Sequence, residues 1–232
     1  MAERILLTND DGYLSPGLQA LYEALSGEAK VTVVAPDRER SAVAMGITLT
    51  DPLRVWPIRD DGLRGYFING TPADCVKIGC SELMDEPPDY VFSGINRGSN
   101  VGLNCVYSGT VAGALEGALL SIPSVAVSLA SFQSNDYRGA VKVALHVLRR
   151  LREVPLEHFE FLSVNVPPLP VEELKGIRVT RVGYTVFREV FDRRHDARDR
   201  EYYWMGGKWT ELGDLEEGDD RAVGRGYAAV TP

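Results

Sequence analysis

The chain has 232 residues, of which 44% are hydrophobic and 25% are charged, a balance typical of a globular protein with a sizeable core. Its formal net charge is −8, with 25 Lys and Arg against 33 Asp and Glu. These values exclude an intrinsically disordered chain, and they argue against long nucleic acids as the main partner because such binding needs a basic surface.

The cysteines and the apolar stretches indicate where the protein works. Three cysteines, an odd number with no CxxC pair, favour neither a disulfide framework nor a zinc knuckle, so we expect a reducing, cytoplasmic location. The N-terminus lacks the basic and then apolar order of a secretory signal. The most apolar later stretch, residues 117–130, is interrupted by Pro123, and we expect no membrane insertion.

The first 36 residues predict a βαβ unit. Residues 4–8 ("RILLT") are a short apolar run, and residues 15–25 follow it with Ser15 as a helix N-cap and Pro16 in the first turn. Residues 30–36 ("KVTVVAP") are the next β-branched run. Two strands joined by a crossover helix lie parallel in one sheet.

The same alternation continues downstream. Buried strands are predicted at residues 89–94, at residues 123–130 and from Phe159, with helices at residues 108–121 and 137–153. The alternation predicts an α/β fold with a Rossmann-like, doubly wound and mostly parallel sheet. In such sheets ligands bind beyond the carboxyl ends of the strands.

Two segments depart from the alternation. Residues 48–67 carry three turn signals, which predicts an irregular or hairpin insertion in a Rossmann-like core of residues 1–176. Residues 177–232 alternate β-branched and aromatic residues with charged ones, which predicts a C-terminal antiparallel β arm. Its strand edges and aromatics predict a homodimer, or a dimer of dimers, built by exchanging or pairing arms. These aromatics include Tyr202, Tyr203 and Trp204.

The loop after the first strand carries two adjacent carboxylates, Asp10 and Asp11. On an extended strand they would point to opposite faces, so they converge only if the chain turns, and Gly12 permits that turn. Asn-Asp-Asp-Gly is also favourable turn chemistry, so an ordinary surface turn that happens to be acidic is the alternative interpretation.

Three further loops at the same predicted edge of the sheet are polar and rich in glycine. "APDRERSAVAMG" contains Ser41, "SGINRGSN" contains Asn96 and Asn100, and "YSGTVAG" opens a helix. Oxygen donors from Asp10, Asp11, Ser41 and Asn96, with no His or Cys, suit Mg²⁺, Mn²⁺ or Ca²⁺ better than zinc. We therefore expect a hard divalent cation at this edge.

The loop "SGTVAG" also suits an anion. Ser108 is a predicted N-cap, and the free backbone N–H groups of residues 109–111 would face outward at the positive end of the helix dipole. This pattern predicts a phosphate site. The alternative is an ordinary capped helix in which Gly113 and Gly117 only permit close packing on the sheet.

Five sequence blocks, in order and spacing, resemble the SurE family (stationary-phase survival protein). They are "LLTNDDG", "APDRERSAV", "NGTPADCV", "SGINRGSNVG" and "YSGTVAGALEGA", and the similarity extends to the closing "GYAAVTP". The resemblance implies a metal-dependent 5′- and 3′-nucleotidase whose C-terminal segment serves association. One departure is Met45 and Gly46, where the family commonly has a Gly-His-Ser-type stretch.

The resemblance also implies roles for single residues. The family's metal ligands would fall on the four oxygen donors already named, Asp10, Asp11, Ser41 and Asn96. Its phosphate contacts would fall on four further residues, with residues 69–71 near the rim of the site. These contacts are Asn9, Ser108, Gly109 and Thr110.

The resulting hypothesis is a phosphomonoesterase that acts on nucleoside monophosphates with one Mg²⁺ or Mn²⁺ per subunit. Water activated by the cation attacks phosphorus directly, and Asp10 or Asp11 orients or deprotonates it. Asn9 and the amides of residues 108–110 hold the phosphoryl oxygens.

Three other classes make different demands on these residues. A haloacid-dehalogenase-type phosphatase needs an Asp nucleophile where this chain has Asn9. A response-regulator receiver needs a phosphoacceptor Asp where residues 93–96 read Ser-Gly-Ile-Asn. A module that senses a nucleotide through the same loops without hydrolysing it stays open as the alternative function.

Overall fold

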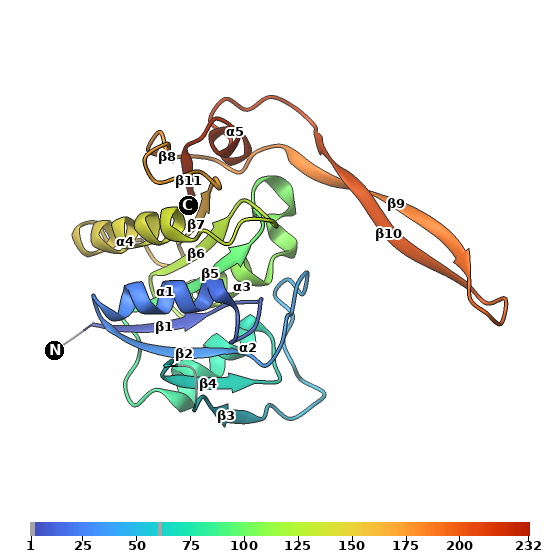
Figure 1. The fold of residues 1–232 in the computed structure, drawn as a ribbon. Coiled ribbons are helices and arrows are strands. Elements are labelled where there is room, and N and C mark those ends of the chain that lie inside the picture. The colour runs from blue at the N-terminus through green and yellow to red at the C-terminus, as the bar shows by residue number, and fades with distance from the viewer. Residues whose placement is uncertain (1–2, 60–61) are drawn as a thin grey trace.

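The computed structural model describes residues 3–59 and 62–232, and they form a nine-stranded sheet with helices on both faces (Figure 1). A two-stranded ribbon projects from one end of this body. The strands of the large sheet are β1 (Arg4–Thr8), β2 (Lys30–Pro36), β3 (Val55–Pro57), β4 (Gly65–Ile68), β5 (Tyr90–Arg97), β6 (Ser124–Leu129), β7 (Phe161–Val166), β8 (Ile177–Val179) and β11 (Ala228–Thr231). The ribbon is β9 (Thr185–His195) and β10 (Glu201–Glu211).

The order of strands in the sheet is β3-β4-β2-β1-β5-β6-β7-β11-β8, and the central strands β4 to β7 are parallel. The chain leaves β1 toward β2 on one side and later returns to β5 on the other side. The carboxyl ends of β1 and β5 therefore border the topological switch point, where α/β sheets bind ligands. The predicted doubly wound, mostly parallel fold is confirmed.

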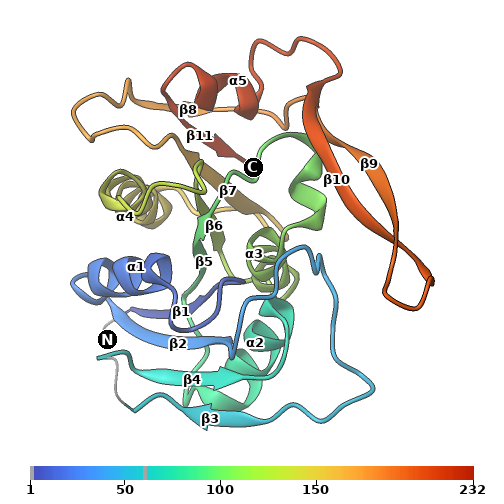
Figure 2. The same cartoon turned by 45° about the vertical axis from the view of Figure 1, so that its right-hand side comes forward.

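Helices cover both faces of the sheet (Figure 2). One face is packed by α1 (Pro16–Ser26) and α4 (Arg138–Glu153), and the other by α2 (Pro72–Ile78) and α3 (Gly109–Leu119). The chain also contains the short η1 (Gly79–Leu83), η2 (Gly102–Tyr107) and α5 (Asp219–Gly224). No helix in the described part of the chain is long and apolar enough to cross a membrane.

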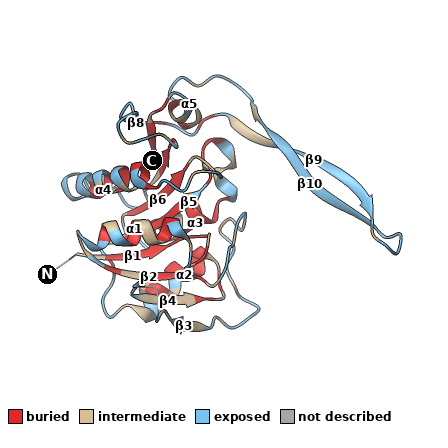
Figure 3. Cartoon of the chain, viewed as in Figure 1, coloured by how far each residue is buried: buried red, intermediate tan, exposed pale blue. Residues whose placement is uncertain are grey.

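The double cover explains why β1 is a continuous apolar run. Ile5, Leu6 and Leu7 are all fully buried, although alternate side chains point to opposite faces (Figure 3). Each such side chain contributes on the order of 2 kcal/mol to folding. The strand is thus held rigidly from both sides, and it presents the acidic loop at its end.

The two predicted N-caps, Ser15 and Ser108, are confirmed, and Thr71 caps a further helix. Ser15 accepts a hydrogen bond from the Leu18 amide, and Thr71 forms a capping box with Asp74 at the start of α2. The Ser108 hydroxyl accepts from the Val111 amide at 3.1 Å. Each cap satisfies an amide that the helix itself leaves without a partner.

Residues 48–67 contribute to the edge of the sheet. β3 pairs antiparallel with β4, which is the predicted hairpin, and β4 also pairs in parallel with β2. The segment is therefore joined to the main sheet by backbone hydrogen bonds. Residues 60 and 61 of the predicted insertion lie outside the described residues.

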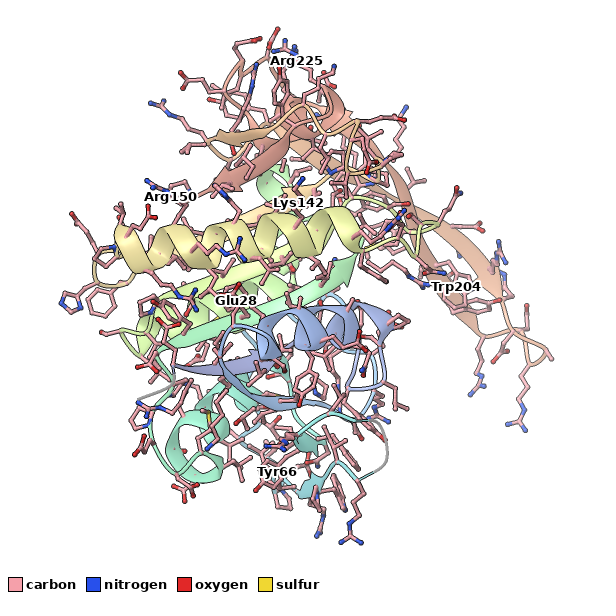
Figure 4. All side chains as sticks on the ribbon, turned by 60° about the vertical axis from the view of Figure 1, so that its left-hand side comes forward. Glu28, Tyr66, Lys142, Arg150, Trp204 and Arg225 are labelled. Carbon is pink, nitrogen blue, oxygen red and sulfur yellow. The ribbon has the colours of Figure 1, made fainter. Side chains whose placement is uncertain are left out.

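Residues 177–232 divide differently from the predicted arm. β8 and β11 belong to the large sheet, because β11 pairs antiparallel with β7 and parallel with β8. Every residue of β11 is buried, which an arm would not provide. Only β9 and β10 form a separate antiparallel sheet, paired from Thr185–Glu211 to His195–Glu201, and Figure 4 shows Trp204 on this projecting ribbon.

Candidate metal and phosphate site

Asp10 lies at the end of β1 and faces the first turn of α3. Its side chain is 4% exposed, and its Oδ1 accepts a hydrogen bond from the Thr110 hydroxyl. A Cβ added to Gly109 would lie 2.8 Å from the Asp10 Cβ and 3.0 Å from its Oδ2. The carboxylate and the helix N-terminus are therefore in direct contact, and only glycine at position 109 allows it.

Asp11 lies against the carboxyl end of β5. Its Oδ2 accepts the backbone N–H of Arg97 at 3.2 Å, and its side chain is partly exposed. The turn between the two acids and α1 depends on Gly12, whose φ is +91°. A side chain at Gly12 would also meet the backbone of Arg38 at 3.1 Å.

Burial perturbs both carboxylates. It raises the pKa of Asp10 to about 6, and the Thr110 hydroxyl acts in the opposite direction. Burial also raises the pKa of Asp11, with a further increase from the nearby Glu39 carboxylate. Two acids whose negative charge is disfavoured, side by side at the switch point, are an arrangement that a bound cation would stabilise.

The loop after β2 is fastened to the acidic loop. The Arg40 amide donates to the Asp10 carbonyl at 2.7 Å, which brings the neighbouring Ser41 to the same edge of the sheet. Ser41 is exposed, and its hydroxyl donates to Glu39 Oε1 at 2.7 Å. The Arg40 guanidinium donates to the carbonyl of Asn69, so the predicted rim segment lies beside this loop.

Asn96 stands at the carboxyl end of β5, next to Arg97. The pairing of β5 with β6 shifts register between Gly94 and Asn96, an irregularity that redirects side chains at the end of a strand. The Asn96 amide nitrogen donates to the Gly98 carbonyl at 2.9 Å. This hydrogen bond uses Nδ2 and orients the amide group, which leaves Oδ1 as the atom that could bind a cation.

Asn9 is buried and shapes the acidic loop. Its Nδ2 donates to the Gly12 carbonyl at 2.9 Å and to Ser15 Oγ at 2.7 Å, so both amide hydrogens are used within the loop. A phosphate contact through this amide, as predicted, would require the side chain to turn. Among the described residues Asn9 Oδ1 has no hydrogen-bond partner, although it is buried.

The donor chemistry of this edge fits a hard cation. The described residues contain no group of three or more His, Cys, Asp or Glu side chains that could hold a metal ion. The predicted ligand set has two carboxylates, and its other donors are the hydroxyl and amide oxygens of Ser41 and Asn96. All-oxygen sets of this kind suit Mg²⁺ and Mn²⁺.

The first turn of α3 offers an anion site beside these oxygens. Ser108, Gly109 and Thr110 are buried, and helix geometry leaves the first amides of α3 without intrahelical acceptors. The dipole of α3 adds positive potential at this end. A phosphate group bound here would lie next to Asp10, one of the proposed cation donors.

A cavity of about 270 Å³ opens beside Asp11. Its lining includes Glu39, Arg97 and Tyr137, and sequence reasoning assigned none of these a role. Glu39 and Arg97 lie in loops already recognised as polar, so their position after a strand was a usable signal. A larger cavity of about 430 Å³ lies at the opposite edge, lined by Arg4 and Lys30 among others.

Comparison with known proteins gives consistent similarities. The family model described as "Survival protein SurE" matches residues 5–189. A 5′-nucleotidase SurE from Syntrophus aciditrophicus (strain SB) is 49% identical over 236 residues, covering 99% of this chain and 87% of that protein. One from Syntrophobacter fumaroxidans is 47% identical, covering 99% and 92%. The crystal structure of the SurE protein from Aquifex aeolicus is 41% identical with a TM-score of 0.86, covering 99% and 92%.

Proposed function

The chain belongs to the SurE family and is a nucleotidase, and we propose that it hydrolyses nucleoside 5′- and 3′-monophosphates with one divalent cation, Mg²⁺ or Mn²⁺, per subunit. The relatives are named 5′-nucleotidases. The 3′ activity, the cation and the mechanism are our own proposals.

The observation that carries the proposal is the contact of Asp10 with the first turn of α3. A carboxylate attracts a cation, and a helix N-terminus attracts an anion. Here Gly109 removes the side chain that would separate them, and the Thr110 hydroxyl joins them by a hydrogen bond. A phosphomonoester bridging a cation and a helix N-terminus needs this juxtaposition.

The site residues have two proposed roles, binding the cation and binding the phosphate. Asp10, Asp11, Ser41 and Asn96 would hold the cation through oxygen atoms. When bound, the cation would supply Lewis-acid chemistry, lowering the pKa of water and neutralising phosphate charge. The amides of Gly109 and Thr110 would hold the phosphoryl oxygens as charge develops on them.

Asp11 is better placed than Asp10 to orient the attacking water and to accept its proton. Asp10 is buried and its Oδ1 is occupied by Thr110, whereas Asp11 is partly exposed and borders the cavity. A raised pKa favours acceptance of a proton, and burial raises the pKa of Asp11. We assign Asn9 to holding the loop, through its hydrogen bonds to Gly12 and Ser15.

The nucleoside would occupy the cavity beside Asp11, because this cavity adjoins the proposed phosphate position. Its lining combines the apolar Leu14 and Tyr137 with the charged Glu39 and Arg97. Among the described lining residues Arg97 is the basic one. It is exposed, so it could reach a ligand from the rim.

The arm supports our proposal of a homodimer or a dimer of dimers. Val190, Phe191, Trp204 and Met205 are each more than 60% exposed on the ribbon of β9 and β10. So many exposed apolar side chains on two adjacent strands are typical of an association surface. A second copy of the chain would cover them.

The decisive experiment measures phosphate release from 5′- and 3′-nucleoside monophosphates with Mg²⁺, with Mn²⁺ and with EDTA. We expect release with either cation, none with EDTA, and none from Asp10→Asn. The matched control is Asp85→Asn, an exposed acid at the opposite edge, which should keep full activity. Nucleotide binding without release under any cation would contradict the proposal and favour the sensor alternative.

A further inference from the structure

The root of the arm is fastened to the short helix η2, which directly precedes α3. In Figure 2 the unlabelled green helical turn that precedes α3 in the chain lies beside the ribbon of β9 and β10. A side chain at Gly102 would collide with the Thr185 carbonyl, so the two backbones are in contact. The Asn104 Oδ1 accepts the backbone N–H of Phe187 at 2.9 Å. This backbone contact and this hydrogen bond fix the position of η2 relative to β9.

Asp219 joins the same two segments from the other side. It is 2% exposed, and its Oδ1 accepts the amides of Gly102 at 3.0 Å, Gly183 at 2.8 Å and Asp220 at 2.8 Å. Hydrogen bonds to a carboxylate are stronger than those between neutral groups. The neighbouring Asp220 accepts the amide and hydroxyl of Thr185, which holds the arm root in the same cluster.

The other end of η2 reaches the proposed site. The Tyr107 carbonyl accepts the amide of Ala44, in the loop that carries Ser41. The Ser108 amide donates to the Cys105 carbonyl at 3.1 Å, so the N-cap of α3 is itself bonded to η2. Residues 102–107 are therefore hydrogen-bonded both to the loop that carries Ser41 and to the N-cap residue of α3.

We propose that Asn104 and Asp219 are positioning residues for the nucleotidase reaction: by anchoring η2 to the root of the arm, they hold the first turn of α3 against Asp10. This inference rests on the proposed function, since it concerns the same phosphate site. Neither residue contacts Asp10 or belongs to the proposed ligand set. Nothing in the sequence motifs of the site points to them.

The consequence is larger for the phosphate side of the site than for the cation side. Losing either anchor lets η2 and the start of α3 shift, and displacements of about 1 Å can cost roughly a hundredfold in rate when reacting groups are misaligned. The cation donors Asp10 and Asp11 follow β1, which is buried on both faces, whereas the loop that carries Ser41 is bonded to η2 through Ala44 and Tyr107. The anchoring of η2 therefore contributes more to phosphate affinity than to cation affinity.

The test compares Asn104→Ala and Asn104→Asp with the wild type, well below their unfolding temperatures. Asn104→Ala removes the acceptor for the Phe187 amide, and we expect kcat/KM to fall by roughly tenfold and inhibition by inorganic phosphate to weaken. Asn104→Asp keeps an oxygen acceptor and should restore both values. The Mn²⁺ concentration for half-maximal activity should change less among the three proteins than the phosphate affinity does.

A matched control removes a buried hydrogen bond from the same end of the molecule. Thr180 Oγ1 and Thr231 Oγ1 are 2.8 Å apart and buried, and their hydrogen bond involves neither η2 nor residues 183–187. Thr180→Val should lower thermal stability and leave the kinetic constants and the phosphate affinity unchanged. This variant separates a loss of stability from a loss of positioning.

Asp219→Asn provides the second readout, because an amide oxygen can still accept N–H groups but without the charge. We expect inorganic phosphate, measured by its thermal shift, to bind it more weakly than the wild type. Wild-type phosphate affinity in both Asn104→Ala and Asp219→Asn would overturn the inference. This binding measurement decides it even if the wild type releases no phosphate, in which case the proposed function fails separately.

Discussion

Gly109 lies so close to Asp10 that a single methyl group on its Cα would stand 2.8 Å from the Asp10 Cβ and 3.0 Å from Oδ2. The third nearest atom is the Arg40 carbonyl oxygen at 3.2 Å, which precedes Ser41 in the chain. One glycine thus sets the distance between the acidic loop, the loop of Ser41 and the helix that would bind phosphate.

Gly109→Ala should inactivate the enzyme without unfolding it. The added methyl group forces either the carboxylate or the first turn of α3 to move by several tenths of an ångström, and we expect kcat/KM to fall by about a hundredfold. Alanine favours the helix itself, so the free energy of unfolding should change little. Steady-state kinetics and urea unfolding measure the two effects.

The matched control is Gly224→Ala, because a Cβ at this last residue of α5 meets no atom within 4 Å. It should keep wild-type kinetic constants. Full activity in Gly109→Ala would show that the contact with Asp10 is not needed for the reaction.

Asp10→Asn should stabilise the metal-free protein. The pKa of Asp10 is raised from 3.8 to about 6 in the folded state, so the folded state binds more protons than the unfolded state between these values. The wild type therefore loses stability as pH rises from about 4 to about 6, by on the order of 3 kcal/mol in total. Asparagine carries no charge and avoids this loss.

Urea unfolding in EDTA, at several pH values, measures the difference between the two proteins. The advantage of Asp10→Asn should grow as pH rises through this window and stay constant above it. Saturating Mn²⁺ should reverse the order at pH 7.5, since the cation binds only the intact carboxylate. Equal stabilities at pH 7.5 without metal would argue against a buried, unpaired charge.

Thr110→Val should move the pH dependence of activity to higher pH. The Thr110 hydroxyl lowers the pKa of Asp10, so its removal raises that pKa and lets protons compete better with the cation. At pH 6 and limiting Mn²⁺ we expect activity to fall by roughly tenfold, because a buried hydrogen bond to a charged group is lost. Thr110→Ser retains the hydroxyl and should have the wild-type profile.

Arg97→Ala should affect substrate binding more than turnover. If Arg97 contacts the nucleotide from the rim of the cavity, it binds ground state and transition state alike, so KM should rise by roughly tenfold with kcat within about twofold. The control is Arg138→Ala, another exposed arginine near this cavity that pairs with Asp136. A fall in kcat at unchanged KM would assign Arg97 to the chemical step.

The arm should govern association. Phe191 and Met205 face each other across β9 and β10, and both are more than 60% exposed. Replacing both with aspartate should convert the proposed dimer to a monomer in sedimentation equilibrium, because charge at the centre of an apolar interface is costly to bury. Wild-type protein that sediments as a monomer at micromolar concentration would refute the assembly.

The local features of the fold followed from the sequence because short-range geometry controls them. Ser15 and Ser108 were each recognised as a cap from the residues that follow them, and each forms that cap. Apolar runs of five to eight residues predicted the parallel strands, because a strand covered on both faces has no polar side. The family was likewise readable from five blocks in fixed order.

The sequence did not predict in the same way which distant strands pair with each other. The pattern of residues 177–232 is that of strands, yet it does not reveal which sheet each strand joins, and β8 and β11 joined the large one. Partner choice depends on burial against distant segments. For β11 this segment is β7, about sixty residues earlier in the chain.

For the site, the sequence by itself identified the oxygen donors and the helix N-terminus, because their chemistry is a property of single residues and local turns. Only the tertiary structure decided that Gly109 contacts Asp10 and that Arg97 lines a cavity beside Asp11. It also decided that the Asn9 side-chain amide donates both its hydrogen bonds within its own loop. No sequence motif could have identified Asn104 and Asp219. Asn104 bonds to a residue 83 positions away in the chain, and Asp219 to one 117 positions away. Residue types set which interactions are possible, and the folded chain selects the pairs that come within reach.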